Sequence, residues 1–175
     1  MAGKNAKRPA TAIEYGIALV AARSRTEKGL RERLEARYPE SEVVAAMDRL
    51  RELRMVDDAV WAVRFVQDRS GRVGHGRHRI GREMVRRGID AATVEKALAE
   101  ALPEEGERVR ALAVLATLRS RLGVEDEPSP TTAGHAVVDR MAARRDAERI
   151  KARLFRRMLA RGYSASLVRD LLAVS

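Results

Sequence analysis

The chain has 175 residues, 45% of them hydrophobic and only 3% aromatic, which excludes an intrinsically disordered chain and is typical of a helical protein. Its formal net charge of +10 favours a polyanionic partner, which can be nucleic acid, an acidic protein surface or anionic lipid. The lack of cysteine excludes disulfides and thiolate metal sites.

No segment of the sequence indicates export or membrane insertion. The first residues, MAGKNAKRPA, are basic but have no apolar region behind them, and no apolar run reaches the roughly 18 residues that a membrane-spanning helix needs. We therefore expect a soluble protein of the cytoplasm, a reducing compartment in which the absence of cysteine is ordinary.

The first predicted elements follow a basic, flexible arm at residues 1–11. A helix is expected from about Ala12 to Arg23, and Ser24 and Glu27 have the spacing of a capping box for the next helix. A second group of helices begins after Asp57.

Asp57 and Asp58 are better explained as residues that cap a helix than as acid–base groups. In the helix that follows, Trp61, Phe65 and Val66 share one apolar face, which indicates core packing rather than a platform for stacking bases.

A third group begins with a helix from about Glu107 to Leu122. An insertion follows at about residues 123–146; it opens with acidic residues, prolines, threonines and glycine, and therefore begins as a loop. From His135 to Arg145 the same insertion has the composition of a short additional helix.

These three groups are copies of one pattern. The segments Leu34–Met47, Val85–Leu98 and Leu159–Leu172 have apolar residues at the same four positions when they are aligned. We predict an all-α protein of three tandem three-helix repeats that form an elongated, curved array. The repeats are expected at residues 12–56, 57–103 and 104–175.

Within each copy, a tight turn joins the second helix to the third. Gly88 and Gly162 stand where a helix needs a left-handed residue at its end, and Asp90 and Ser164 follow as N-caps. In the first copy Arg37 replaces the glycine and proline replaces the cap, so this turn must be built differently.

The stretch RVGHGRHRIGREMVRRGID, from Arg72 to Asp90, allows three interpretations. A phosphate-binding glycine loop must follow a strand, but the preceding WAVRFVQDRSG has the period of a helix. A metal site on His75 and His78 lacks further ligands, because only His135 remains and there is no cysteine. A turn that leads into a basic helix fits best, and we expect neither a cofactor nor a metal.

Two helices in equivalent positions carry most of the positive charge. Arg72–Gly88 contains six arginines against one glutamate, and Arg140–Arg161 contains nine basic residues against two acidic ones. Stacked repeats place equivalent faces on one surface, so we predict a continuous basic groove. Its predicted contact residues are Arg77, Arg79, Arg82, Arg86, Arg87, Arg149, Arg153, Arg156 and Arg157.

Four segments carry a resemblance to a known family: SRTEKGLRERL, LRMVDDAVWAVRFVQDR, GHGRHRIGREMVRRGID and RLFRRMLARGYSASLVRDLL. In their order and spacing they resemble the RecX family, the regulators of the RecA recombinase. The resemblance covers about Ala12 to Val174. Arg54 and Met55 depart from it, because the family tends to have glycine and an aromatic residue there. Trp61 takes a position usually held by phenylalanine, and the insertion is longer than in the family.

The resemblance implies a non-enzymatic modulator of RecA, usually an inhibitor. Such a protein lies in the helical groove of the RecA–single-stranded-DNA filament and reduces filament growth, ATP hydrolysis and strand exchange. The implied partner is the RecA filament, with direct contact to single-stranded DNA left open. The sequence contains no Ser–His–Asp spacing and no HExxH motif, which agrees with a non-enzymatic protein. We also expect a monomer that does not bind membranes.

Three other interpretations compete with this one. Each three-helix unit resembles a helix-turn-helix in outline, so the protein is alternatively a stand-alone helical DNA-binding module. A helical scaffold for an acidic protein unrelated to recombination is a second alternative. A membrane-surface role is the least favoured, because the apolar faces of the basic helices are needed for the core.

Overall fold

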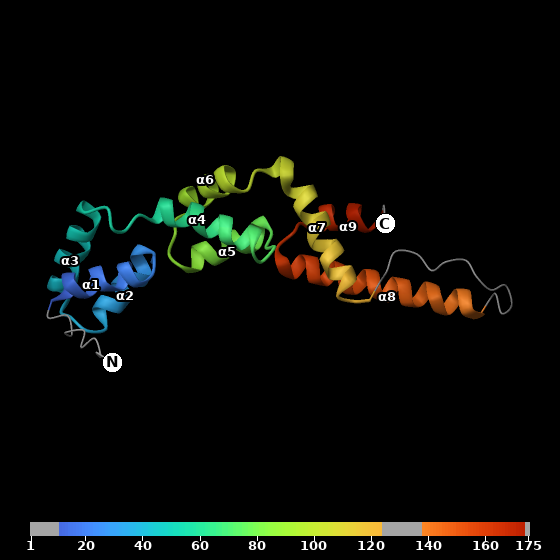
Figure 1. Ribbon diagram of the computed structural model, residues 1–175, viewed down its shortest axis with the longest axis horizontal. Coiled ribbons are helices and arrows are strands. Elements are labelled where there is room, and N and C mark those ends of the chain that lie inside the picture. The colour runs from blue at the N-terminus through green and yellow to red at the C-terminus, as the bar shows by residue number, and fades with distance from the viewer. Residues whose placement is uncertain (1–10, 124–137, 174–175) are drawn as a thin grey trace, which may run out of the picture. The chain divides into compact units, whose positions relative to one another are not determined.

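A computed structural model describes residues 11–123 and 138–173, and in these residues the fold is all-α, as the sequence predicts (Figure 1). The elements are α1 (Ala12–Ala22), α2 (Glu27–Glu35), α3 (Glu40–Glu52), α4 (Asp58–Gly71), α5 (Arg77–Arg86), α6 (Ala91–Ala101), the short 3-10 helix η1 (Glu104–Gly106), α7 (Glu107–Ser120), α8 (Val138–Arg161) and α9 (Ala165–Ala173). The predicted repeat boundaries and the elongated, curved shape stay predictions. The predicted arm lies outside the described residues, apart from Thr11.

The chain forms two compact units. The first contains the described residues up to Phe65 together with Glu83–Ala97, and the second contains Val66–Arg82 together with the described residues from Leu98 onward. Helices α4, α5 and α6 therefore each begin in one unit and end in the other.

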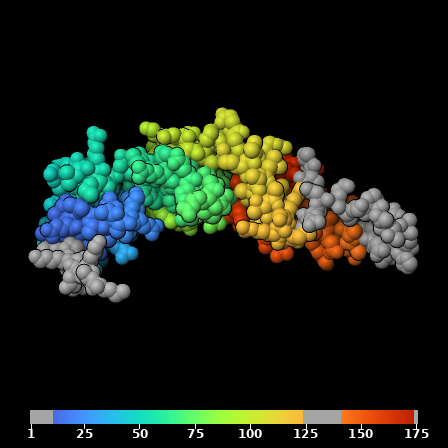
Figure 2. Space-filling view, in the orientation of Figure 1, coloured from blue at the N-terminus to red at the C-terminus, as the bar shows by residue number. Residues whose placement is uncertain are grey.

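In the first unit α1, α2 and α3 pack against one another, and Figure 2 shows their surfaces in direct contact at the blue end of the colour scale. Gly16 allows α1 and α3 to approach closely, since a Cβ atom at this position would lie 2.7 Å from Leu50 Cδ1. The buried apolar core of these helices consists of Ala12, Leu30, Leu34, Val43, Ala46, Met47, Leu50 and Val56.

In the second unit α7, α8 and α9 enclose an apolar core. Its buried members are Ala111, Leu115, Leu118, Leu154, Met158, Tyr163, Val168, Leu171 and Leu172. On α7 and α8 they recur every three or four residues, which is the spacing that turns one helix face inward.

Threonines cap the first two helices. The Thr11 hydroxyl accepts from the Glu14 N–H at 3.3 Å and the Glu14 carboxylate accepts from the Thr11 N–H at 3.3 Å, which makes a capping box for α1. Thr26 Oγ1 accepts from the Gly29 N–H at 3.1 Å and caps α2. The predicted box of Ser24 and Glu27 is therefore wrong, because α2 begins at Glu27 and Ser24 lies two residues before its cap.

The turns after α5 and α8 follow the sequence prediction. Gly88 and Gly162 have φ values of 87° and 91°, in the left-handed region that glycine adopts without strain. The Asp90 carboxylate accepts from the Thr93 N–H at 2.9 Å, and the Ser164 hydroxyl accepts from the Leu167 N–H at 3.3 Å.

The corresponding turn after α2 is built differently, as expected. It contains no residue of positive φ, and the N–H groups of Arg37 and Tyr38 both donate to the Leu34 carbonyl, at 2.9 and 3.0 Å. Pro39 precedes α3 without a side-chain cap.

The described part of the insertion belongs to α8. Instead of a separate helix from His135 to Arg145, α8 runs without a break for 24 residues from Val138; His135 lies outside the described residues. All side chains from Met141 to Arg149 are exposed, so these turns contribute nothing to the core.

Candidate basic interface

The exposed arginines of α5 are Arg82 and Arg86. Neither side chain has a hydrogen-bond or ion-pair partner among the described residues. Both guanidinium groups are therefore available to bind carboxylate or phosphate.

Arg77, by contrast, is half-buried and supports the fold. Its Nη1 atom donates to the carbonyl oxygens of Leu98 at 3.5 Å and Leu102 at 3.1 Å, and its Nε atom lies 3.8 Å from Glu104 Oε1. These carbonyls belong to the end of α6, whose last turn lacks partners within the helix. Arg77 therefore acts as a C-terminal cap of α6.

Arg79 belongs to the α5–α8 junction, which we define as the contact between the start of α5 and the end of α8. The Gly76 N–H donates to the Arg161 carbonyl at 2.7 Å, the His78 N–H donates to the Gly162 carbonyl at 3.3 Å, and Arg79 Nη1 donates to the Ala160 carbonyl at 2.9 Å. Unpaired donors at a helix start thus meet unpaired acceptors at a helix end, and the two helix dipoles are complementary.

The same junction explains the glycine-rich stretch. A Cβ atom on Gly76 would lie 2.6 Å from the carbonyl carbon and oxygen of Gly162, so only glycine allows this approach. The stretch is therefore a docking turn that leads into a basic helix. The N–H group of Gly76 is occupied by a protein carbonyl and cannot bind a phosphate.

An equivalent junction joins the start of α2 to the end of α5 within the first unit. Thr26 Oγ1 donates to the Arg87 carbonyl at 3.0 Å. A Cβ atom on Gly88 would lie 2.7 Å from Lys28 Cβ, just as one on Gly162 would lie 2.4 Å from Arg79 Cβ. Lys28 and Arg79 occupy equivalent positions in the alignment that predicts the repeats, so the two junctions share one design.

Arg87 is half-buried beside this α2–α5 contact. Its Nη1 atom donates to the Glu83 carbonyl at 2.9 Å and lies 4.0 Å from the Glu83 carboxylate, and its guanidinium lies 4.9 Å from the centre of the Phe65 ring. Like Arg77 and Arg79, it is already engaged with protein groups.

On α8, Arg153 and Arg156 are exposed and Arg157 is half-buried, and none of the three side chains has a partner among the described residues. Arg149 is exposed and forms an i,i−3 ion pair with Asp146 at 3.3 Å. The arginines of α8 lie in the second unit with Arg77, Arg79 and Arg82, whereas Arg86 and Arg87 lie in the first. A continuous groove that contains all nine residues stays a prediction.

The two aspartates at the start of α4 cap different helices. Asp57 Oδ1 accepts from the N–H groups of Ala59 at 2.9 Å and Val60 at 3.0 Å, which caps α4. Asp58 Oδ1 accepts from the Glu27 N–H at 2.8 Å, at the start of α2, and its burial raises the pKa of its carboxyl. The capping interpretation is confirmed. Within the described residues no cluster of His, Asp or Glu has the make-up of a metal site.

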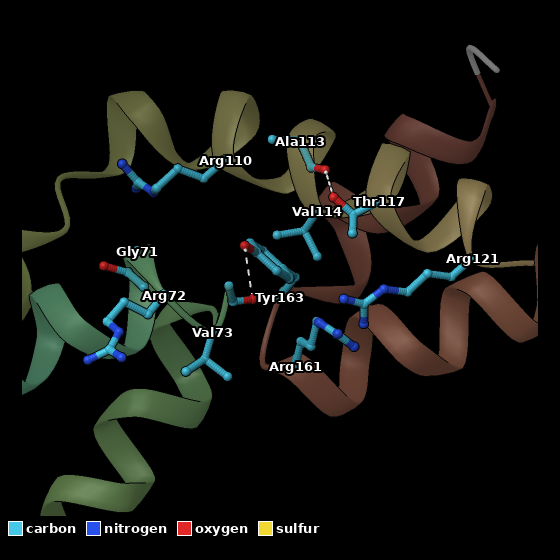
Figure 3. Close-up of a pocket in the computed structure, with 12 residues that line it drawn as sticks. Gly71, Arg72, Val73, Arg110, Ala113, Val114, Thr117, Arg121, Arg161 and Tyr163 are labelled. Carbon is cyan, nitrogen blue, oxygen red and sulfur yellow. Dashed lines mark hydrogen bonds between the residues drawn. The ribbon is translucent and has the colours of Figure 1, made fainter.

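A second group of arginines surrounds a cavity of about 610 Å³ in the second unit, which we call the arginine pocket (Figure 3). Arg110 reaches it from α7, Arg121 from the C-cap of α7, Arg72 from the turn after α4, and Arg161 from the end of α8. Burial of Tyr163 beside the pocket raises the pKa of its phenol, while Arg110 and Arg161 oppose the rise and Glu107 adds to it.

This pocket was not predicted from the sequence. A signal was present, because Arg110, Val114, Thr117 and Arg121 recur at the spacing of one helix face and all four line the cavity. The spacing alone does not reveal that this face lies opposite Arg72 and Arg161.

Comparisons with known proteins agree on one family. Residues 57–98 match the family model described as RecX, second three-helix domain. The regulatory protein RecX of Mycolicibacterium vanbaalenii is 31% identical over 173 residues, which cover 97% of this chain and 84% of the relative. The regulatory protein RecX of Thermus thermophilus is 36% identical over 110 residues, which cover 63% of this chain and 72% of the relative.

The fold agrees as well. The crystal structure of RecX from Lactobacillus salivarius is 15% identical in sequence, has a TM-score of 0.69, and is matched over 93% of this chain and 92% of its own. No helix within the described ranges is long and apolar enough to cross a membrane. Because the sequence identity extends over nearly the whole chain and the helical fold is shared, the chain belongs to the RecX family of regulatory proteins.

Proposed function

We propose that the protein is a non-enzymatic regulator of RecA that binds as a monomer in the groove of the RecA–single-stranded-DNA filament, in the cytoplasm. It inhibits filament growth and thereby reduces ATP hydrolysis and strand exchange. The observation that carries this proposal is the 31% identity to a regulatory protein RecX over 97% of the chain.

The contact surface is best assigned to the arginines without partners among the described residues, namely Arg82, Arg86, Arg153, Arg156 and Arg157. Arginine pairs in a bidentate manner with the carboxylates of an acidic protein surface and with phosphates, the two chemistries of a RecA filament on DNA. Of the remaining predicted residues, Arg77 and Arg79 donate to the ends of other helices, and Arg87 pairs with Glu83 and lies over the Phe65 ring. Replacing these three would confuse loss of binding with loss of structure.

The proposal is tested by measuring ATP hydrolysis of the cognate RecA, preassembled on single-stranded DNA, while the protein is titrated in at constant salt. The variant R82E/R86E/R153E/R156E should need about tenfold or more protein for half-maximal inhibition, which corresponds to about 1.4 kcal/mol of lost binding free energy. The unmodified protein should inhibit at amounts well below one per RecA subunit.

The matched control is R23E/R33E/R64E/R108E, which makes the same change in net charge at exposed arginines that have no partner among the described residues. It should inhibit nearly as well as the unmodified protein. Equal loss in both variants would show that only net charge matters. Inhibition that begins only when the protein coats the DNA would instead favour the stand-alone DNA-binding module.

A further inference from the structure

The arginine pocket is independent of the surface assigned above, because it uses none of the nine predicted residues. Of the residues that the structure describes, four arginines line it and no aspartate or glutamate does. Two acidic groups of the described residues act on its side chains: Asp68, which pairs with Arg72 at 3.3 Å, and Glu107, which acts on the Tyr163 phenol. Neither carboxylate belongs to the lining, so the pocket is strongly positive.

Arg121 and Arg161 are the free donors of the pocket. Arg72 is engaged with Asp68, and Arg110 Nη2 donates to the Pro103 carbonyl at 2.6 Å. The side chains of Arg121 and Arg161 have no hydrogen-bond or ion-pair partner among the described residues. In Figure 3 their guanidinium groups extend toward one another from the ends of α7 and α8, beside Tyr163.

Two guanidinium groups that converge repel one another, and an anion that accepts hydrogen bonds from both offsets this repulsion. The backbone of the α5–α8 junction holds the second of them, since the Arg161 carbonyl accepts from the Gly76 N–H. The backbone position of Arg161 is therefore set before a ligand arrives, and the two side chains lose rotamer freedom only when they bind the anion.

We propose that the arginine pocket binds a phosphate group of a single-stranded polynucleotide. A phosphate has enough acceptor oxygens for both guanidinium groups at once, and Arg forks match its geometry. The cavity, at about 610 Å³, has the size of pockets that hold a nucleotide-sized ligand rather than one carboxylate. Val73 and Val114 give it an apolar wall for a sugar or base, and the exposed Arg72 adds a positive charge for an adjacent phosphate.

The test is the fluorescence anisotropy of a labelled oligothymidylate titrated with the full chain. The variant R121Q/R161Q should bind about tenfold more weakly, and the slope of log affinity against log salt should fall by about one. The control R108Q/R144Q removes the same charge at exposed arginines of the same unit that do not line the pocket, and it should retain the affinity. Equal affinity of both variants overturns the proposal.

The NMR signals of the arginine Nε–H groups in the unmodified protein give a second readout that does not depend on how a variant folds. Oligothymidylate should shift the Arg121 and Arg161 signals, and inorganic phosphate at matched ionic strength should shift them weakly. If phosphate shifts these signals and oligothymidylate does not, the pocket binds the free ion and the proposal of a polynucleotide ligand is wrong. If only oligoglutamate shifts them, the pocket binds an acidic protein segment and the proposal fails.

Regulation of RecA is measured separately on the same variants. R121Q/R161Q can lose affinity for oligothymidylate while inhibition of RecA ATP hydrolysis persists, or the reverse. The phosphate pocket and the proposed function therefore stand or fall on different measurements.

Discussion

Arg54 is a strained residue at the end of α3. Within the part of the chain that the structure describes, it alone among residues other than glycine has a positive φ, of 51°. The Met55 N–H donates to the Leu50 carbonyl at 2.9 Å, which completes the helix-ending turn that favours glycine at position 54. The RecX family tends to have glycine there, and the backbone of this turn gives the physical reason.

We expect R54G to stabilise the protein by about 0.5–1 kcal/mol, because a left-handed conformation is costly for a residue with a Cβ atom, although glycine loses more chain entropy on folding. Urea unfolding followed by circular dichroism measures the difference. R54A is the control, since it removes the side chain but keeps the Cβ atom and the strain. Equal stabilisation by R54A and R54G would show that the backbone is not the cause.

Local signals at single residues were readable from the sequence where one turn decides the outcome. Gly88, Gly162, Asp90 and Ser164 were predicted because glycine and capping side chains act on their own backbone. Ser24 was wrongly predicted as a cap because threonine at position 26 competes for the same role two residues later. The arginine pocket was missed because it is assembled from three separate segments.

At the scale of elements, the two helix junctions organise the molecule. Helix positions were predictable because apolar residues recur with the helical period, and the predicted bounds of α1 and α7 differ from the observed ones by one or two residues. The exception is α8, which continues without a break through the region where a separate short helix was expected. The junctions were not predictable, since the partner of the Gly76 N–H is a carbonyl far along the chain. The sequence shows a glycine at position 76, and the structure explains it by the close approach of the Gly76 and Gly162 backbones.

We expect G76A to destabilise the protein by about 1–3 kcal/mol, because the added methyl group would overlap the Gly162 backbone. Gly71, the last residue of α4, is the matched control: a Cβ atom there has no neighbour within 4 Å. G71A should be neutral or slightly stabilising, since alanine favours helix. Denaturant midpoints measure both. Similar midpoints for the two variants would rule out a tight junction.

At the scale of the whole molecule, each compact unit is made of two separated stretches of chain. A repeat predicted from the sequence therefore does not coincide with a compact unit, because α4, α5 and α6 of the predicted second repeat are each divided between the two units. The all-α class and the order of the helices followed from the sequence, whereas this division follows from contacts between distant residues.

A fragment of residues 11–56, which contains the first predicted repeat, should be much less stable than the full chain. It keeps its apolar core but loses the Asp58 carboxylate that accepts from the Glu27 N–H and the Arg87 carbonyl that accepts from Thr26. So small a core leaves little net stability, and repeat arrays gain stability from the contact between neighbours. Thermal melts by circular dichroism should show a broad, early transition, and a longer fragment of residues 11–97 should melt later. A fragment of residues 11–56 that melts with the full chain would contradict this.

The junctions give the repeats a direction, because each one places the beginning of a middle helix on the end of the next. Among the described residues no helix begins against the end of α2, and there position 37 carries an arginine, stacked 4.5 Å from the centre of the Tyr15 ring, in place of the glycine that a docked neighbour demands. The start of α8 differs from the docked starts of α2 and α5, because every described side chain of its first turns, through Arg149, is exposed. Relatives of this protein are thus free to lengthen or shorten the start of α8 during evolution, whereas a single residue gained before Arg77 would shift the register of a docked helix.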